Sequence, residues 1–127
     1  MSDSENPLDW LSFAYEDLRS ASFLYDNLYP RPLEIISYHC QQTVEKALKS
    51  YLYAYKKLVP KTHDLTLLSQ KCADINPSFE DYFDICGDLT PVAVNARYPN
   101  KIEITEKETQ AALQGAKEIY DFVKNTM

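Results

Sequence analysis

The stretch YHCQQTVEKALKSYLYAYKK, residues 38–57, decides the fold class, because its apolar residues recur at helical spacing. A rotation of about 100° per residue gathers the apolar side chains of this region on one broad arc. The apolar arc consists of Ile36, Cys40, Val44, Ala47, Leu48, Tyr51, Leu52 and Tyr55. The opposite side carries a polar ridge, which consists of His39, Gln42, Lys46, Lys49 and Tyr53. The region is therefore predicted to form an amphipathic helix.

The polar ridge has two interpretations. It is either an ordinary solvent-exposed face, which any amphipathic helix requires, or a binding site, and periodicity alone favours the exposed face. Gln41 and Glu45 differ from the ridge because they lie beside the apolar arc, where an unpaired buried polar group costs roughly 1–3 kcal/mol. They indicate a polar pocket between helices, a polar dimer seam, or side chains that reach water or cap a neighbouring helix.

Helix-start and helix-stop signals precede this segment. Asn6 is a suitable N-cap and Pro7 suits the first helical position, so a first helix is predicted from there to the YPRP segment at residues 29–32. The prolines of that segment cannot lie inside a helix. The central helix is predicted to begin near Pro32 and to run to about Lys57.

Two further helices are predicted after a loop. Asp64 is placed to cap a short helix over residues 65–75. Ser78 and Asp81 stand at capping-box spacing, which predicts the start of a fourth helix.

The end of the fourth helix and the start of the last one have clear local signals. Gly87 and Pro91 make the fourth helix imperfect, so a kink or break is predicted near Thr90. After an irregular link, Thr105 and Glu108 form a T-x-x-E capping box, which predicts a final helix that nearly reaches the C-terminus.

The helices together indicate an all-α protein. Long helices with short connections favour an antiparallel up-and-down helical bundle of four to five helices. The 2 glycines leave few tight turns of the kind that β-hairpins need. The length of 127 residues suits one helical domain over residues 1–127, with its core in residues 7–124.

Composition narrows the classes of function. No apolar run approaches the roughly 20 residues that span a bilayer. The N-terminal MSDSENPLDW is too acidic and polar for a signal peptide, so the expected compartment is cytoplasmic. Cys40, Cys72 and Cys86 are an odd number without a C-x-x-C pair, which argues against a disulfide framework and a zinc site. We therefore expect buried free thiols, no metal and no cofactor.

Charge is distributed unevenly along the chain. The net charge of −6 weakly opposes non-specific binding to nucleic acid. Residues 46–71 nevertheless carry six lysines against Asp64, a net charge of +5, whereas residues 1–30 carry six acids against Arg19, a net charge of −5. This asymmetry indicates either a basic patch for an anion or acidic partner, or mutual neutralisation of packed helices, and the second is slightly favoured.

Familiar enzyme signatures are absent from the sequence. There is no phosphate-binding or dinucleotide-binding glycine motif, no G-x-S-x-G and no H-E-x-x-H. His63 and Asp64 form either an acid–base couple or, more commonly, a loop residue followed by an N-cap. Arg97 and Tyr98 lie in the irregular link, where Arg97 suits an anion ligand or a partner for the carboxylates.

Taken together, the motifs resemble a known family. Trp10, Ala14, Asp17 and Leu18 form an early W-x-x-x-A-x-x-D-L pattern, which is followed by YHCQQTVEKALKSYL, THDLTLL and ARYP. This combination resembles the HEPN domain family over residues 7–124. The resemblance implies a helical bundle that commonly dimerises. It also implies either a toxin–antitoxin partnership with a minimal nucleotidyltransferase or metal-independent ribonuclease activity through an R-x(4–6)-H motif.

That ribonuclease motif is not present in this chain. No histidine follows Arg97, and seven residues separate Arg31 from His39. The expected function is therefore a dimeric binding module for a nucleotide, a nucleotidyltransferase subunit or both, without its own chemistry. The expected contacts are His39, Gln42, Glu45, Lys46, Lys49, His63, Arg97 and Tyr98. The alternative is a metal-independent ribonuclease in which His63 and Arg97 replace the usual catalytic residues.

Overall fold

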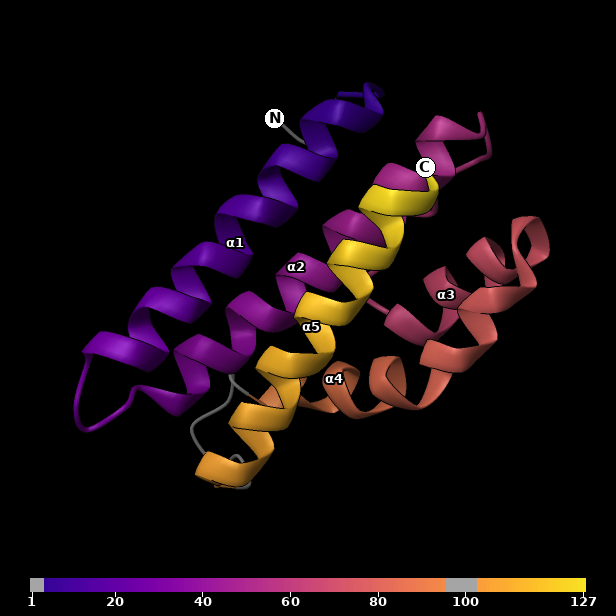
Figure 1. The fold of residues 1–127 in the computed structure, drawn as a ribbon. Coiled ribbons are helices and arrows are strands. Elements are labelled where there is room, and N and C mark those ends of the chain that lie inside the picture. Colours follow the sequence, from indigo (N-terminus) through magenta and orange to yellow (C-terminus); the bar gives the residue numbers. More distant parts are fainter. Residues whose placement is uncertain (1–3, 96–102) are drawn as a thin grey trace.

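A computed structural model describes residues 4–95 and 103–127, and the side chains of residues 91–95 are not described. The described residues form five α-helices and one 3-10 helix, η1, and contain no strand (Figure 1). The elements are α1 (Pro7–Asn27), α2 (Leu33–Ala54), α3 (Leu65–Ile75), η1 (Pro77–Tyr82), α4 (Phe83–Asn95) and α5 (Glu106–Thr126). The predicted all-α helical bundle is therefore confirmed.

Helix α2 lies at the centre and contacts each of the other α-helices (Figure 1). Side-chain contacts give the helix directions. Oγ of Ser50, near the end of α2, lies 2.7 Å from the carbonyl oxygen of Pro7 and 3.1 Å from Sδ of Met127. At the start of α2, Oγ of Ser37 lies 3.3 Å from Oγ1 of Thr109. Helix α1 therefore runs antiparallel to α2, and α5 runs parallel to it.

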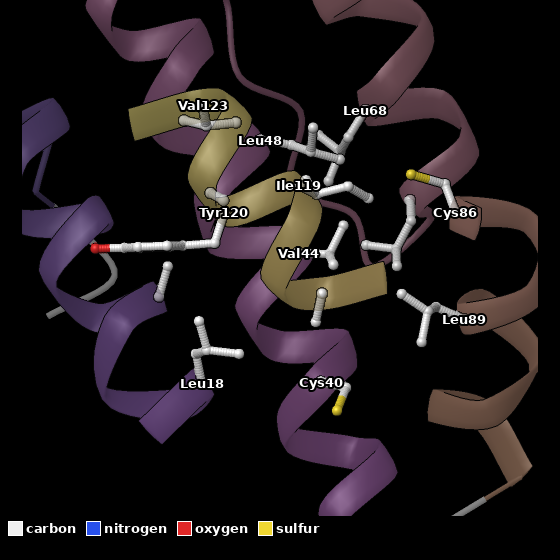
Figure 2. Packing of buried hydrophobic residues seen from close by; sticks show 14 of the residues in the cluster. Leu18, Cys40, Val44, Leu48, Leu68, Cys86, Leu89, Ile119, Tyr120 and Val123 are labelled. Atoms are coloured by element: carbon white, nitrogen blue, oxygen red, sulfur yellow. The ribbon is translucent and has the colours of Figure 1, made fainter. Parts of the chain in front are cut away.

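The core collects apolar side chains from α1, α2, α3, α4 and α5 (Figure 2). The 3-10 helix η1 adds Phe79 to it. All residues of the predicted apolar arc are buried except Tyr55, which is exposed. Tyr55 escapes burial because α2 ends at Ala54, earlier than predicted. Lys56 there adopts a positive φ of 57°, and the Lys57 N–H returns to the carbonyl of Leu52, which closes the helix. The three cysteines are free and buried, as expected.

Local capping signals located most helix starts correctly. Asn6 and Asp64 accept backbone hydrogen bonds as N-caps, and the Thr105–Glu108 capping box is present. The predicted capping box at Ser78 is wrong, because the side chain of Asn76 accepts the Ser78 N–H and starts η1 instead.

The predicted break near Thr90 does not end the fourth helix. Helix α4 begins at Phe83 and continues through Thr90 and Pro91 to Asn95. Thr90 Oγ1 donates to the carbonyl of Cys86 on the same helix. Pro91 cannot donate to the carbonyl four residues before it, so α4 lacks one hydrogen bond there but still continues to Asn95. None of the helices in the described part of the chain is long and apolar enough to cross a membrane.

The two glycines offer a matched test of helix packing. An added Cβ on Gly115 of α5 would lie 2.7 Å from Cγ2 of Ile85, whereas an added Cβ on Gly87 of α4 would meet nothing within 4 Å. We expect Gly115→Ala to destabilise the protein by about 1–2 kcal/mol, because overpacking exceeds the gain in helix propensity. We expect Gly87→Ala to stabilise it by about 0.5–1 kcal/mol.

Urea denaturation of both variants measures these changes in the free energy of unfolding. Stabilisation by both substitutions would show that α4 and α5 are not packed closely at Gly115.

Candidate functional site

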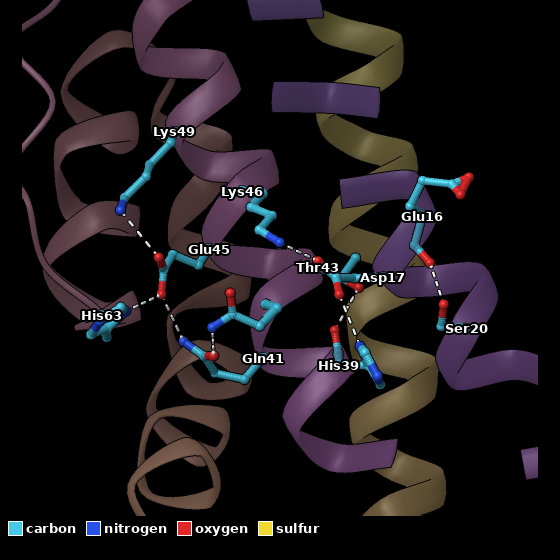
Figure 3. Close-up of polar contacts among 11 residues, drawn as sticks. Glu16, Asp17, Ser20, His39, Gln41, Thr43, Glu45, Lys46, Lys49 and His63 are labelled. Atoms are coloured by element: carbon cyan, nitrogen blue, oxygen red, sulfur yellow. Dashed lines mark hydrogen bonds and ion pairs between the residues drawn. The ribbon is translucent and has the colours of Figure 1, made fainter. Parts of the chain in front are cut away.

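The polar ridge of α2 packs against α1 (Figure 3). Asp17 of α1 accepts from two residues that lie about two turns apart on α2. Nδ1 of His39 lies 2.9 Å from Oδ1 of Asp17, and Nζ of Lys46 lies 2.6 Å from its Oδ2. The side chain of Asp17 is mostly buried, and those of His39 and Lys46 are partly buried. We call these three residues the Asp17 cluster.

The next turns of the ridge contact Trp10 of α1. The rings of Trp10 and Tyr53 stack with centroids 5.8 Å apart, and Nζ of Lys49 lies 5.8 Å from the Trp10 ring centroid. The interpretation of the ridge as an ordinary solvent-exposed face is therefore wrong. At His39, Lys46 and Tyr53 the ridge forms an interface with α1.

A second polar group forms around Glu45, which is only 4% exposed (Figure 3). Its Oε1 lies 3.0 Å from Nε2 of Gln41 and 2.8 Å from Nδ1 of His63, and its Oε2 lies 3.1 Å from Nζ of Lys49. Gln42 Nε2 in turn donates to Oε1 of Gln41 over 2.6 Å. We call these five residues the Glu45 cluster. Several interpretations were open for Gln41 and Glu45. In the structure both lie in a polar site within the fold, which extends to the α2–α3 loop.

The contacts of each cluster keep its carboxylate ionised. Burial acts to raise the pKa of Glu45, but hydrogen bonds from His63 and Gln41 and the charge of Lys49 hold that pKa below its ordinary value. Burial also acts to raise the pKa of Asp17, but the hydrogen bonds and charges of His39 and Lys46 hold that pKa below its ordinary value. Each cluster thus places a histidine beside a charged acceptor.

The buried polar groups in this part of the fold are satisfied. Among the described residues, every buried side-chain nitrogen or oxygen has a hydrogen-bond partner. The bond between Lys46 and Asp17 also joins the basic and acidic segments of the sequence, which supports mutual neutralisation of packed helices as one origin of the charge asymmetry. Lys49 is neutralised separately, by Glu45 on its own helix.

Beside the Asp17 cluster lies a hollow of about 600 Å³. The α1 hollow is lined by Arg19, Ser20, Phe23, Leu24 and His39. The side chain of Phe23 is 63% exposed, and Arg19 forms an exposed pair with Glu16. The hollow therefore combines an accessible aromatic surface, a guanidinium and an imidazole.

The structure places most of the predicted contact residues in these two clusters. His39 and Lys46 belong to the Asp17 cluster, whereas the Glu45 cluster holds Gln42, Glu45, Lys49 and His63. Asp64 is the N-cap of α3, as the commoner interpretation expected, and His63 pairs with Glu45. Arg97 and Tyr98 lie outside the described residues. No group of three or more potential metal ligands occurs in the described parts of the chain.

Sequence reasoning missed Asp17, Arg19 and Phe23 as members of the site. A signal existed for Asp17, since this acid lies between Ala14 and Leu18 on the apolar stripe of α1. An acid in that position has to find a partner on the neighbouring helix. Arg19 and Phe23 carried no comparable signal, because a hollow depends on which helix packs alongside.

Acidification is expected to destabilise the protein through Asp17 and Glu45. Their folded pKa values lie below the ordinary values of 3.8 and 4.5, so the ionised forms favour the folded state. This contribution is complete above about pH 5 and is lost as the pH falls through the ordinary values toward the folded ones. Urea unfolding between about pH 6 and pH 3 measures the loss.

The variants Asp17→Asn and Glu45→Gln supply the controls for this pH dependence. Each removes one of the two titrating groups, so each variant should lose less stability than the unaltered protein over the same acid range. An unchanged acid dependence in both variants would contradict the assignment.

Comparisons with known proteins agree with this fold. A family model described as the HEPN domain matches residues 8–126. The chain is similar to the crystal structure of TT1696 from Thermus thermophilus, with a TM-score of 0.77, 25% identity, and coverage of 98% of this chain and 100% of that chain. It shares its fold with ST0689, an archaeal HEPN homologue, with a TM-score of 0.74, 24% identity, and coverage of 94% and 96%. A search of curated proteins found no match.

Proposed function

The chain belongs to the HEPN domain family, and from this premise we propose that it is a binding module that holds a nucleotide and acts with a partner protein rather than as an enzyme on its own. The partner proposed is a minimal nucleotidyltransferase subunit in a two-component, toxin–antitoxin-like system. The module itself is proposed to be a homodimer.

The α1 hollow is the observation that carries the nucleotide part. Its volume of about 600 Å³ lies in the range of small-molecule sites, roughly 300–1,000 Å³. A base that stacks on Phe23 gains about 1–3 kcal/mol. Arg19 is available to a phosphate, because its exposed pair with Glu16 contributes little.

His39 gives this hollow a fixed polar wall. Asp17 is ionised and accepts from Nδ1 of His39, so the imidazole is oriented before any ligand binds. Lys46 holds the same carboxylate from the other side. Lys46 lies in the helix interface, where its bond to Asp17 helps to hold that carboxylate in place beside His39. The proposed ligand contacts are His39, Arg19 and Phe23.

Exposed apolar side chains support the association part of the proposal. Leu8 and Tyr15 of α1 are exposed, as are Tyr29 and Ile35 around the link to α2. Aromatic side chains are enriched in protein interfaces. We propose this exposed surface of the α1–α2 pair as the region through which the module associates.

Calorimetry with ATP, GTP and short RNA tests nucleotide binding. Phe23→Ala is expected to weaken binding about five- to 150-fold through lost stacking, and Arg19→Gln is expected to weaken binding of the triphosphates. Lys107→Gln, which removes an exposed cation on α5, is the matched control and should leave binding unchanged. No detectable heat with any of the three ligands would reject the nucleotide part.

Mass determination after crosslinking, on protein purified from its own cells, tests the partner. Co-purification of a second, nucleotidyltransferase-like chain is the expected result. A homodimer without any second chain would reject the two-component part and leave the nucleotide part standing.

A metal-independent ribonuclease is the second candidate, and one contact favours it. His63 holds Nδ1 against the Glu45 carboxylate and has an exposed side chain, which suits a general base. This candidate requires RNA cleavage without added metal that His63→Ala abolishes. Intact RNA after prolonged incubation with the purified protein would reject it.

A further inference from the structure

The hydrogen bond between His63 and Glu45 fixes which nitrogen of the imidazole is free. Nδ1 of His63 lies 2.8 Å from Oε1 of Glu45. The ionised carboxylate can only accept a hydrogen bond, so Nδ1 must carry the proton. In the neutral ring, the lone pair is then on Nε2.

Nε2 of His63 is open to reagents in solution. The side chain of His63 is 60% exposed, although the side chain of its partner Glu45 is only 6% exposed. Within residues 4–95 and 103–127, Nε2 has no hydrogen-bond partner. The loop thus presents an unoccupied lone pair on a ring whose other nitrogen is anchored in the protein.

The anchor of this imidazole is rigid. Gln41 donates to the same Glu45 oxygen that accepts from His63, and Lys49 binds the other oxygen. Gln41, Glu45 and Lys49 all project from α2, the central helix of the fold. Because the carboxylate cannot rotate away without breaking these bonds, it remains in place to balance positive charge that develops on the ring.

We propose that Nε2 of His63 is a phosphoryl-acceptor site, which takes a phosphoryl group from a high-energy phosphoryl donor of the phosphoramidate class. The Nε2 lone pair attacks phosphorus and forms the Nε2–P bond, while the P–N bond of the donor breaks and ammonia leaves with its electron pair. The ring becomes a phosphoimidazolium that keeps its Nδ1 proton. Its positive charge lies against the Glu45 carboxylate.

One neighbouring charge attracts the phosphoryl group and another repels it. Lys61 is exposed two residues before His63 and attracts it. Asp64 follows His63 and is the adverse charge, but its carboxylate is engaged as the N-cap of α3, where it accepts the Leu67 N–H. The buried carboxylate that holds Nδ1 and the lysine two residues earlier in the loop therefore favour this site.

His39 is the internal comparison. Its Nδ1 also meets a carboxylate, that of Asp17, but Lys46 shares that carboxylate at 2.6 Å and the ring is only 28% exposed. The imidazole of His39 also lines the α1 hollow instead of projecting from a loop. We therefore expect His63 to be phosphorylated much faster than His39.

Incubation of the full chain with potassium phosphoramidate, followed by intact mass and peptide mapping, tests the proposal. The expected product carries one phosphoryl group on His63, labile to acid and stable to base, and forms at least about tenfold faster than on N-acetylhistidine. Glu45→Gln should slow it about tenfold, because the charge that stabilises the imidazolium is lost. Glu118→Gln, an exposed carboxylate on α5, is the control and should leave the rate unchanged.

Two outcomes would overturn the proposal. One is a rate at His63 no higher than that of N-acetylhistidine in the folded protein. The other is a His63 rate that Glu45→Gln does not change, with circular dichroism showing that the variant is folded. If Glu45→Gln does not fold, nitrogen-15 NMR of the unaltered protein decides instead, and a proton on Nε2 in the neutral ring would overturn the proposal.

The labelling test does not depend on the nucleotide hollow or on RNA cleavage, although His63 is also the general base of the ribonuclease candidate. Phosphoramidate labelling of His63 does not require the α1 hollow, and a general base would leave no covalent adduct. Failure of either functional proposal is therefore distinguishable from failure of this one.

Discussion

Replacing Glu45 by alanine is expected to destabilise the protein by about 3–5 kcal/mol, because it removes one partner from a buried ion pair and leaves the other. Glu45 is 4% and Lys49 9% exposed, so the ammonium of Lys49 would lose its counter-charge without gaining water. The amide of Gln41, which is fully buried, would lose its acceptor as well. Urea denaturation measures the change in the free energy of unfolding.

The double variant Glu45→Met with Lys49→Met separates charge from packing. Replacing a whole buried ion pair by apolar residues of similar volume is often neutral, so the double variant is expected to lose less than about 2 kcal/mol. It would then be more stable than Glu45→Ala despite carrying two substitutions, which is the non-additivity expected of coupled residues. A double variant as unstable as Glu45→Ala would mean that the bonds to Gln41 and His63 matter more than the ion pair.

The sequence predicts local features such as helix caps, but it does not predict the buried contacts of the Glu45 cluster. Asn6, Asp64 and Thr105 were recognised as caps because capping depends on residues within one turn, all of which are adjacent in the sequence. The same rule wrongly predicted a capping box at Ser78. The side chain of Asn76, two residues earlier, accepts the Ser78 N–H and begins a 3-10 helix instead.

The interpretation of the polar ridge as a solvent-exposed face was wrong for a different reason. A helical rotation of α2 shows which residues share a face, but it does not show that α1 covers the face that carries His39 and Lys46. The one sequence signal for the covering helix was Asp17, an acid on the apolar stripe of α1, and it was not used. The pairing of Glu45 with His63 joins residues 18 positions apart across a loop, and spacing alone does not predict it.

Replacing Phe79 by alanine is expected to destabilise the protein by about 3–5 kcal/mol, as for other large aromatic side chains removed from cores. Phe79 is fully buried although it projects from η1, a short 3-10 helix with little stability of its own. Its ring packs edge-on against Tyr51 of α2, 4.6 Å between centroids, and against Phe122 of α5 at 4.9 Å. The loss would leave a cavity where η1, α2 and α5 meet.

Phe23→Ala provides the matched control, since it removes the same atoms from a side chain that is 63% exposed. Its free energy of unfolding should change by no more than about 0.5 kcal/mol, although nucleotide binding should weaken. A loss below about 1 kcal/mol for Phe79→Ala would show that Phe79 does not anchor η1 to α2 and α5. The two phenylalanines therefore separate a residue that holds the fold together from one whose substitution tests the proposed nucleotide site without disturbing the fold.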